Sequence, residues 1–270
     1  TTVPEVKEPT YGEIVWGQFR KNTLGMLALF GFVLLLLIAI CAPLISSDQP
    51  FTVLYEGQRR YPWFEGLLFN KNVYGKGVDV FFNLLLVLLP FVTLTYLLFR
   101  QFRLKGLPGR ERRQRRGRFI KFTAFGIATA FVVLMVVQPQ KAVPDWKDAV
   151  ESGTAVGAVF PILDYSYTET SYLANRGPME GHILGTDSSG RDQFTRMLYG
   201  TRISLTIGVI AVSIYLLIGV TLGSLAGFMG GWVDIVIQRL IEVVMCFPAF
   251  ILILTFMSLL PNKSIFWIMF

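Results

Sequence analysis

Charged side chains are scarce in this sequence. Asp, Glu, Lys and Arg make up 16% of the 270 residues, whereas soluble domains usually carry about 25%. Apolar residues make up 53% and collect into long runs, without strict alternation or a 3.6-residue period. Several runs reach the roughly 20 residues needed to cross a bilayer core about 30 Å thick. The composition therefore excludes an ordinary soluble domain and predicts an integral membrane protein.

Cysteine and histidine are almost absent. Cys41 and Cys246 both fall within apolar runs and cannot form a disulfide framework, and His182 is the single histidine. The chain has no G-x-S-x-G, no H-E-x-x-H and no phosphate-binding G-x-x-x-x-G-K-[ST]. His182, Asp187 and Ser188 invite comparison with a catalytic triad, but nothing in the sequence supplies its geometry. We therefore expect no metal, no cofactor and no active site.

The apolar runs predict an all-α, polytopic membrane protein with five transmembrane helices and the start of a sixth. A short interfacial helix is expected at 11–19, ahead of the first span. The chain ends at Phe270 inside an apolar run, so we expect the natural protein to continue. The spans are predicted at 24–45, 80–99, 119–138, 203–228 and 240–260, with the sixth beginning after Pro261-Asn262-Lys263.

The polar segments between these spans define the expected organisation of the chain. An N-terminal segment precedes the first span, and a hairpin of two spans with a basic loop lies between two polar segments. The expected parts are residues 1–23, 24–79, 80–138, 139–202 and 203–270.

Positive charge is concentrated in one place. Residues 100–118 hold nine Arg or Lys and a single acid, so the positive-inside rule places this segment in the cytoplasm. Counting spans from there puts the N-terminus inside and both 46–79 and 139–202 outside. The alternatives are a nucleic-acid or an anionic-lipid patch. The segment lies between two spans and lacks interleaved aromatic residues for base stacking, so nucleic acid is not expected as a partner.

The predicted fourth span carries three glycines at a spacing of four, Gly219, Gly223 and Gly227. Small residues on one helical face allow another backbone to approach closely. Such a face serves either static helix packing or a moving interface along a translocation path, and both interpretations remain open. The turn after this span, with Gly230, Gly231 and Asp234, is expected on the cytoplasmic side.

A polar motif precedes the fourth span, from His182 to Asp192. Gly185 and Gly190 permit turns, and Thr186 or Asp187 is a suitable N-cap for a following helix. From Gln193 onward the sequence predicts an amphipathic helix at the outer interface that leads into the span. Its expected apolar face holds Phe194, Met197, Leu198 and Thr201, while Arg191, Asp192, Arg196 and Arg202 are expected to face water or headgroups.

Two interpretations of this motif remain open. In the first, it is a capped re-entry segment without a ligand. In the second, it is a docking or gating element at the outer mouth of the protein, built from Gly185, Thr186, Asp187, Gly190, Arg191 and Asp192.

Five motifs follow one another in the last third of the chain: His182-Ile-Leu-Gly-Thr-Asp-Ser-Ser-Gly-Arg-Asp192, Leu198-Tyr-Gly-Thr-Arg-Ile-Ser-Leu205, Ala226-Gly-Phe-Met-Gly-Gly-Trp-Val-Asp234, Gln238-Arg-Leu-Ile-Glu242 and Phe247-Pro248. In order and spacing they resemble the permease subunits of dipeptide, oligopeptide and nickel ABC importers of the bacterial inner membrane. The first span with Ser47-Asp48-Gln49-Pro50 and Tyr55-Glu56-Gly57 looks more weakly like the microcin C/oligopeptide permease branch.

The resemblance implies a peptide-transporting subunit that works with other proteins. These partners would be a second permease, cytoplasmic ATPase subunits and an extracytoplasmic substrate-binding protein facing 182–202. The spans are almost free of ionisable residues, so energy is expected from such a partner rather than from a proton pathway. The family couples to its ATPase through a cytoplasmic loop after a further span, and this chain stops at Phe270, before that loop.

The chain also departs from the family pattern. The family usually runs from its first span through one outer segment to the Gly-Thr-Asp motif, whereas here the hairpin 80–138 interrupts that segment. An even number of added crossings leaves the motif outside. The hairpin could bind anionic lipid, a partner subunit or nothing.

Two alternatives to a permease remain open. The first is a membrane scaffold that moves nothing, and the second is a lipid-modifying enzyme. The sequence does not reveal the substrate.

Overall fold

The computed structural model describes residues 11–105 and 108–259, and most of these are helical. The chain forms two compact units, Thr1–Ile203 and Ser204–Phe270. The first contains three long helices and a small folded region. The second contains most of a fourth long helix and two shorter ones.

The chain begins with two helices in succession, α1 (Tyr11–Lys21) and α2 (Thr23–Ile45). Asn22 separates them, and its side-chain oxygen accepts a 3.0 Å hydrogen bond from the backbone N–H of Gly25, so it acts as the N-cap of α2. The helix expected at 11–19 is present, and α2 matches the predicted span 24–45. Most large apolar side chains along α2 are exposed in this chain, as expected of a helix that faces lipid or another subunit.

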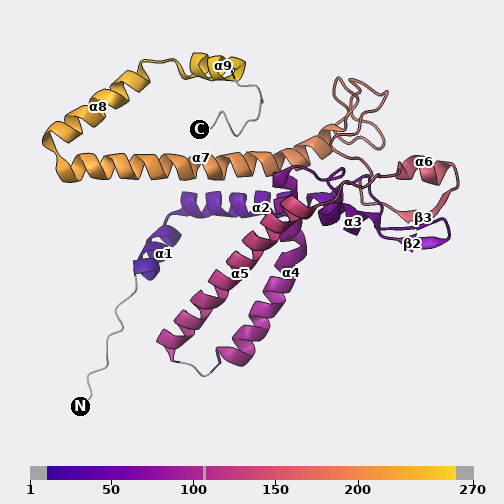
Figure 1. The fold of residues 1–270 in the computed structure, drawn as a ribbon, viewed down its shortest axis with the longest axis horizontal. Helices are drawn as coiled ribbons and strands as arrows, with labels where there is room; N and C mark the ends of the chain where they lie inside the picture. Colours follow the sequence, from indigo (N-terminus) through magenta and orange to yellow (C-terminus); the bar gives the residue numbers. More distant parts are fainter. Residues whose placement is uncertain (1–10, 106–107, 260–270) are drawn as a thin grey trace. The chain divides into compact units, whose positions relative to one another are not determined.

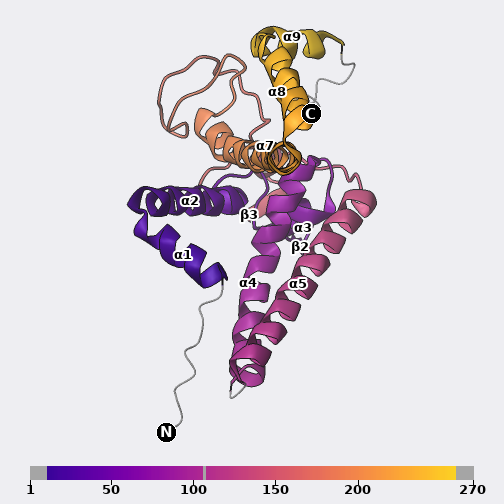
Figure 2. The ribbon, with the colours of Figure 1, turned by 90° about the vertical axis from the view of Figure 1, so that its left-hand side faces the viewer.

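The predicted hairpin is formed by α4 (Gly77–Arg103) and α5 (Gly109–Val137), which run side by side (Figures 1 and 2). The rings of Phe99 and Phe119 stack between them at a centroid distance of 4.9 Å. Both helices are long and apolar enough to be the spans predicted at 80–99 and 119–138, but much of the predicted loop 100–118 is helical. Both helices extend into it, because Arg and Gln are good helix formers and need no burial.

The polar segments on either side of the hairpin fold together into a small sheet, so the described chain is mostly helical, as the all-α prediction expects, but carries three short strands as well. Strands β1 (Thr52–Tyr55), β2 (Gln58–Arg60) and β3 (Ala155–Val159) form an antiparallel sheet in the order β2-β1-β3. Glu56 and Gly57, both with positive φ, make the tight turn between β1 and β2, as a two-residue hairpin loop requires. Strands this short are weak signals in a sequence.

Two short helices complete this folded region, α3 (Pro62–Phe69) and α6 (Trp146–Glu151). Their tryptophans are buried, and each finds a hydrogen-bond acceptor. The indole N–H of Trp63 donates to the carbonyl oxygen of Pro43 at 2.8 Å, and that of Trp146 donates to Gln49 at 2.9 Å. The first bond joins the first polar segment to the end of α2, and the second joins the two polar segments to each other.

The longest helix is α7 (Gln193–Met229), with 37 residues. Its length of roughly 55 Å exceeds the thickness of a hydrocarbon core. The helix that contains the predicted span 203–228 begins ten residues earlier, at Gln193. The helix expected from Gln193 onward is therefore present, and it leads into the span without a break at Gly200 and Thr201.

In the second unit, α7 is followed by α8 (Gly231–Met245) and α9 (Ala249–Leu259). The single span predicted at 240–260 is divided between them, because the axes of the two helices differ by 70° on either side of Cys246-Phe247-Pro248. By length and composition, the described residues contain four membrane-spanning helices, or five if the bent pair is one span. The predicted sixth span lies outside the described residues.

Candidate functional site

The motif before α7 forms a tight loop against the preceding segment. The backbone N–H of Thr186 donates to the carbonyl oxygen of Arg176 at 2.9 Å, and the N–H of Arg176 donates to the hydroxyl of Thr186 at 3.1 Å. Gly185 and Gly190 both have positive φ. Gly185 packs directly on the backbone of Arg176 and Gly177, and Gly190 packs on that of Ser171. Glycine is therefore required at both positions for space as well as for conformation.

The carboxylate of Asp187 organises this loop from within. It accepts hydrogen bonds from the backbone N–H groups of Ser189 at 2.8 Å and Arg191 at 2.9 Å, and it pairs with the guanidinium groups of Arg191 and Arg196. The backbone N–H of Arg191 is the main reason that the pKa of Asp187 lies below its usual value. Asp187 therefore stabilises its own turn.

Asp192, and not Thr186 or Asp187, caps α7. Its Oδ1 accepts a 2.7 Å hydrogen bond from the backbone N–H of Thr195, the usual N-cap geometry. Its Oδ2 lies 2.9 Å from Nδ1 of His182, and both side chains are almost fully buried. Asp192 does not face water or headgroups, contrary to the expectation from the amphipathic pattern.

His182 is held away from the other candidate catalytic residues. Its ring stacks on Tyr165 at a centroid distance of 4.4 Å, and its acidic neighbour is Asp192, whereas Asp187 is paired with arginines. Ser188 is exposed on the outside of the turn. His182, Asp187 and Ser188 therefore do not form a catalytic triad. The alternative of a lipid-modifying enzyme finds no support at His182.

Arg202 is fully buried, which corrects the expectation that it faces water or headgroups. Its guanidinium donates to the carbonyl oxygen of Ala39 at 2.8 Å, to Asp79 at 3.1 Å and to Asn83 at 2.9 Å. A buried cation needs such compensation, because transfer from water without a partner is very costly. Arg202 thereby connects the start of α7 to both α2 and the inserted α4.

Tyrosines extend this buried network toward the end of α2. Tyr167 donates to the second carboxylate oxygen of Asp79 at 3.0 Å, and Tyr199 donates to the carbonyl oxygen of Ser46 at 2.8 Å. The hydroxyl of Tyr74 lies 2.9 Å from that of Tyr199. Burial raises the pKa of Tyr74 to about 12 and also raises that of Tyr167, so both phenols stay protonated and can donate.

Sequence reasoning missed this network. A partial signal exists, because Asp79 and Asn83 are one helical turn apart at the start of an apolar run, and Arg202 directly precedes another. No local sequence pattern indicates that Asp79 and Arg202 form a pair, because they are separated by 123 positions.

The candidate outer element has a buried and an exposed side. Gly185, Thr186, Gly190 and Asp192 are buried. The exposed side carries Ile183 and Leu184, 56% and 43% exposed, together with Ser188 and Ser189. The residues singled out by the motif therefore shape the loop, while neighbouring side chains form the surface that a partner could touch.

The glycine face lies in the second unit. Gly219 and Gly223 line a groove of about 430 Å³ between α7 and α8, whereas Gly227 does not. A Cβ atom built at any of the three meets no atom of the described chain within 4 Å. Close packing at this face therefore requires a partner other than the described residues.

The turn between α7 and α8 is formed by two consecutive glycines. Gly230 and Gly231 both have positive φ, and Gly230 is the N-cap of α8. Asp234 lies in the first turn of α8, where its negative charge interacts favourably with the positive end of the helix dipole. Its carboxylate accepts hydrogen bonds from Gln238 at 3.1 Å. The cytoplasmic location of this turn stays a prediction.

The long apolar helices fit one class of protein, a multi-pass membrane protein, and comparisons with known proteins agree with that class. Residues 10–62 match the family model OppC_N, the N-terminal TM domain of oligopeptide transport permease C. This match covers α1, α2 and the β1–β2 hairpin.

Individual relatives are also permeases. The chain is 43% identical over 107 residues to the dipeptide transport system permease protein DppC of Alkalihalophilus pseudofirmus, covering 38% of this chain and 35% of that relative. It is 45% identical over 88 residues to the glutathione transport system permease protein GsiD of Pectobacterium atrosepticum, covering 33% and 29%. It is 41% identical over 105 residues to the oligopeptide transport system permease protein OppC of Bacillus subtilis, covering 38% and 34%.

These matches confirm the resemblance to peptide-type ABC importer permeases that the motifs indicated. The chain spans about a third of the length of the curated relatives it matches. No solved structure matches it.

Proposed function

We propose that this chain is part of the transmembrane subunit of an ABC importer that moves peptides or similar small solutes across the bacterial cytoplasmic membrane. The observation that carries the proposal is the 41–45% identity to dipeptide, glutathione and oligopeptide permeases. All three relatives are named as transport permeases, which agrees with the expectation that the chain is not an enzyme. The proposed driving force is ATP hydrolysis by partner subunits, because the chain has no phosphate-binding loop.

The proposed arrangement in the membrane has the N-terminus in the cytoplasm, with the bent α8–α9 pair as the fifth span and the sixth starting after residue 263. The pairing of β1 with β3 supports one part of it. Because 46–79 and 139–202 fold into one sheet, they share a side, and the hairpin 80–138 crosses the membrane an even number of times. The nine Arg and Lys of 100–118 favour the cytoplasm for the other side.

Two surfaces are the proposed contacts with partners. The exposed side of the outer element, with Ile183 and Leu184, would meet an extracytoplasmic substrate-binding protein. The glycine face of α7 would pack against a second permease, because no described part of this chain fills it. A membrane scaffold that uses the same face only for oligomerisation is the competing proposal.

The proposal is tested by purifying the full-length protein from its native membrane in mild detergent. A second permease and an ATPase should co-purify with it. Gly223→Leu should reduce the yield of the second permease by roughly fivefold or more, because the added side chain prevents backbone approach. Thr221→Leu is the matched control on the opposite face of α7, and its yield should be unchanged.

Uptake of short peptides distinguishes transport from scaffolding. Cells lacking the protein should lose uptake, and the wild-type gene should restore it. Unchanged uptake in those cells would favour the scaffold, and a purified protein with neither a second permease nor an ATPase would contradict the proposal.

A further inference from the structure

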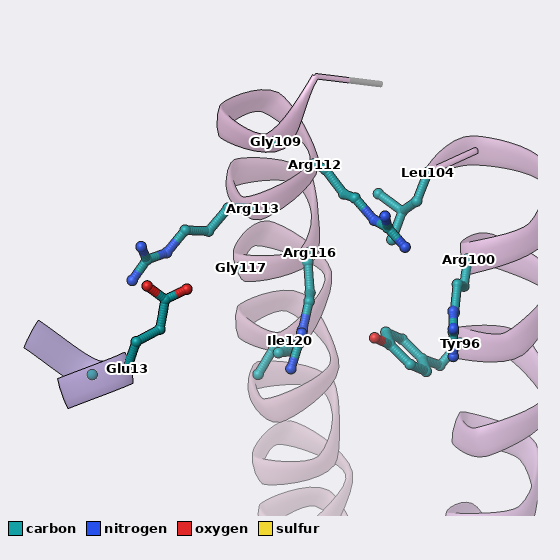
Figure 3. A pocket seen from close by; sticks show the side chains of 11 residues that line it. Glu13, Tyr96, Arg100, Leu104, Gly109, Arg112, Arg113, Arg116, Gly117 and Ile120 are labelled. Atoms are coloured by element: carbon teal, nitrogen blue, oxygen red, sulfur yellow. The ribbon is translucent and has the colours of Figure 1, made fainter. Parts of the chain in front are cut away.

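An open pocket lies where the inserted hairpin meets α1. It has a volume of about 1020 Å³ and is lined by residues of α1, α4 and α5 (Figure 3). Four of its lining residues are arginines: Arg100 from α4, and Arg112, Arg113 and Arg116 from α5. The transport function proposed above assigns no role to this pocket.

The arginines are placed on two facing helices. Arg112 and Arg116 are one turn apart on α5, so they share a face. In Figure 3 Arg112 extends from α5 toward α4, and the hydroxyl of Tyr96 points from α4 toward α5. Arg100 lies one turn beyond Tyr96 on the same side of α4. The gap between the helices is therefore bordered by cationic groups from both.

The positive charge in this gap is not balanced by nearby carboxylates. Glu13 of α1 faces Arg113 on the other side of α5 (Figure 3). For Arg100, Arg112 and Arg116, no ion pair is formed with any acid among residues 11–105 and 108–259. Guanidinium groups are always charged at neutral pH, so their mutual repulsion favours an anion between them.

The position of the arginines along the hairpin indicates what kind of anion fits. The apolar run of α4 covers residues 80–99, about 30 Å of helix, and Arg100 follows it directly. The apolar run of α5 begins at Phe119, one turn after Arg116. Both helices therefore bring their arginines to the level at which a hydrocarbon core gives way to headgroups.

The deeper wall of the pocket is apolar or amphipathic. Tyr96 and Ile120 lie one turn inside the arginines, toward the apolar runs. Tyrosine is favoured where a ring meets hydrocarbon and its hydroxyl meets headgroups. The pocket thus offers cations to a phosphate and an apolar surface to the chain attached to it, which a free anion would not use.

We propose that this pocket binds the phosphate headgroup of an anionic phospholipid, held by Arg100, Arg112 and Arg116, with its acyl chains along the apolar part of α4 and α5. Basic pockets between transmembrane helices are known to hold such headgroups. The site gives the inserted hairpin a function of its own, and it depends neither on the proposed substrate nor on ATP hydrolysis.

The test compares two triple variants of the full-length protein in detergent, R100Q/R112Q/R116Q and the matched control R103Q/R115Q/R118Q. Both remove three positive charges from the same hairpin, but the control arginines do not line the pocket. Binding of phosphatidylglycerol, phosphatidylcholine and inorganic phosphate is measured by native mass spectrometry and by the shift in unfolding temperature.

The wild-type protein should retain phosphatidylglycerol through purification and gain unfolding temperature from it, with little effect of phosphatidylcholine. The pocket variant should lose affinity for phosphatidylglycerol by on the order of 100-fold, since each arginine near an anionic headgroup contributes roughly a factor of five. The control variant should stay within about threefold of wild type. Equal unfolding temperatures without lipid show that all three proteins are folded.

Three results would overturn the proposal. Equal losses in both variants would indicate diffuse attraction to charge and no site. Inorganic phosphate that binds as tightly as the lipid would indicate a free-anion site. Selective loss of an acidic protein partner by the pocket variant, without any change in lipid binding, would identify the pocket as a protein contact.

Discussion

Gly190 is the residue at which space and backbone conformation are most tightly constrained. It has a φ of 75°, and a Cβ atom there would overlap the backbone of Ser171. Gly153 has the same φ but no atom within 4 Å of its Cβ position, so it provides a matched control. The pair separates the cost of an unfavourable φ from the cost of a clash.

We expect Gly153→Ala to lower the free energy of unfolding by about 1–3 kcal/mol, the usual strain of an L residue at positive φ. Gly190→Ala should cost about 2 kcal/mol more, because the loop against 171–176 must move. Unfolding in detergent, followed by tryptophan fluorescence, measures both. Equal losses would mean that the motif loop is not packed as described.

At the scale of elements, the inserted hairpin is fixed to the rest of the first unit through Asp79. Its carboxylate pairs with the fully buried Arg202, so α4 supplies a counter-charge to the start of α7. Asp79→Ala leaves that guanidinium without this partner and should cost about 3–5 kcal/mol of stability. Asp79→Asn, which keeps a hydrogen-bond acceptor, should cost less.

Glu242→Ala is the comparison for this prediction. It removes the partner of Arg239 in an exposed pair of the second unit, whose side chains are 75% and 59% exposed. Such pairs contribute at most about 1 kcal/mol. The same unfolding measurement serves both variants, and comparable losses would show that the Asp79–Arg202 pair is solvated.

At the scale of the whole molecule, the β-sheet joins two segments that are distant in the sequence, so we expect both on one side of the membrane. In a background without Cys41 and Cys246, single cysteines are placed at Gln58, Gln114 and Ser188. A membrane-impermeant thiol reagent added to intact cells should label the first and third and should spare Gln114→Cys. Gln58→Cys reports on the first polar segment, which the pairing of β1 with β3 joins to the second.

Disruption of the membrane should make Gln114→Cys reactive, which shows that the side chain was shielded by the bilayer and not by the fold. Labelling of Gln114→Cys and Ser188→Cys from the same face would contradict the single crossing, by α5, that is proposed between them.

The sequence alone determined which stretches are long and apolar enough to cross a bilayer, the existence of the hairpin and the resemblance to peptide permeases. These properties depend on consecutive residues and not on distant partners. About 20 consecutive apolar residues favour lipid whatever the rest of the sequence contains. The helical ends within 100–118 were missed because they are polar, and hydropathy reports the hydrocarbon core and not the full length of a helix.

Only the tertiary structure decided which polar groups meet. The burial of Arg202 with Asp79, the pairing of β1 with β3 and the contact between His182 and Asp192 each depend on how the outer segments fold over the helix ends. Partners more than 100 positions apart, as in the first two cases, leave no periodic signal. The pairings are fixed instead by the cost of burying a charge or a backbone group without a partner.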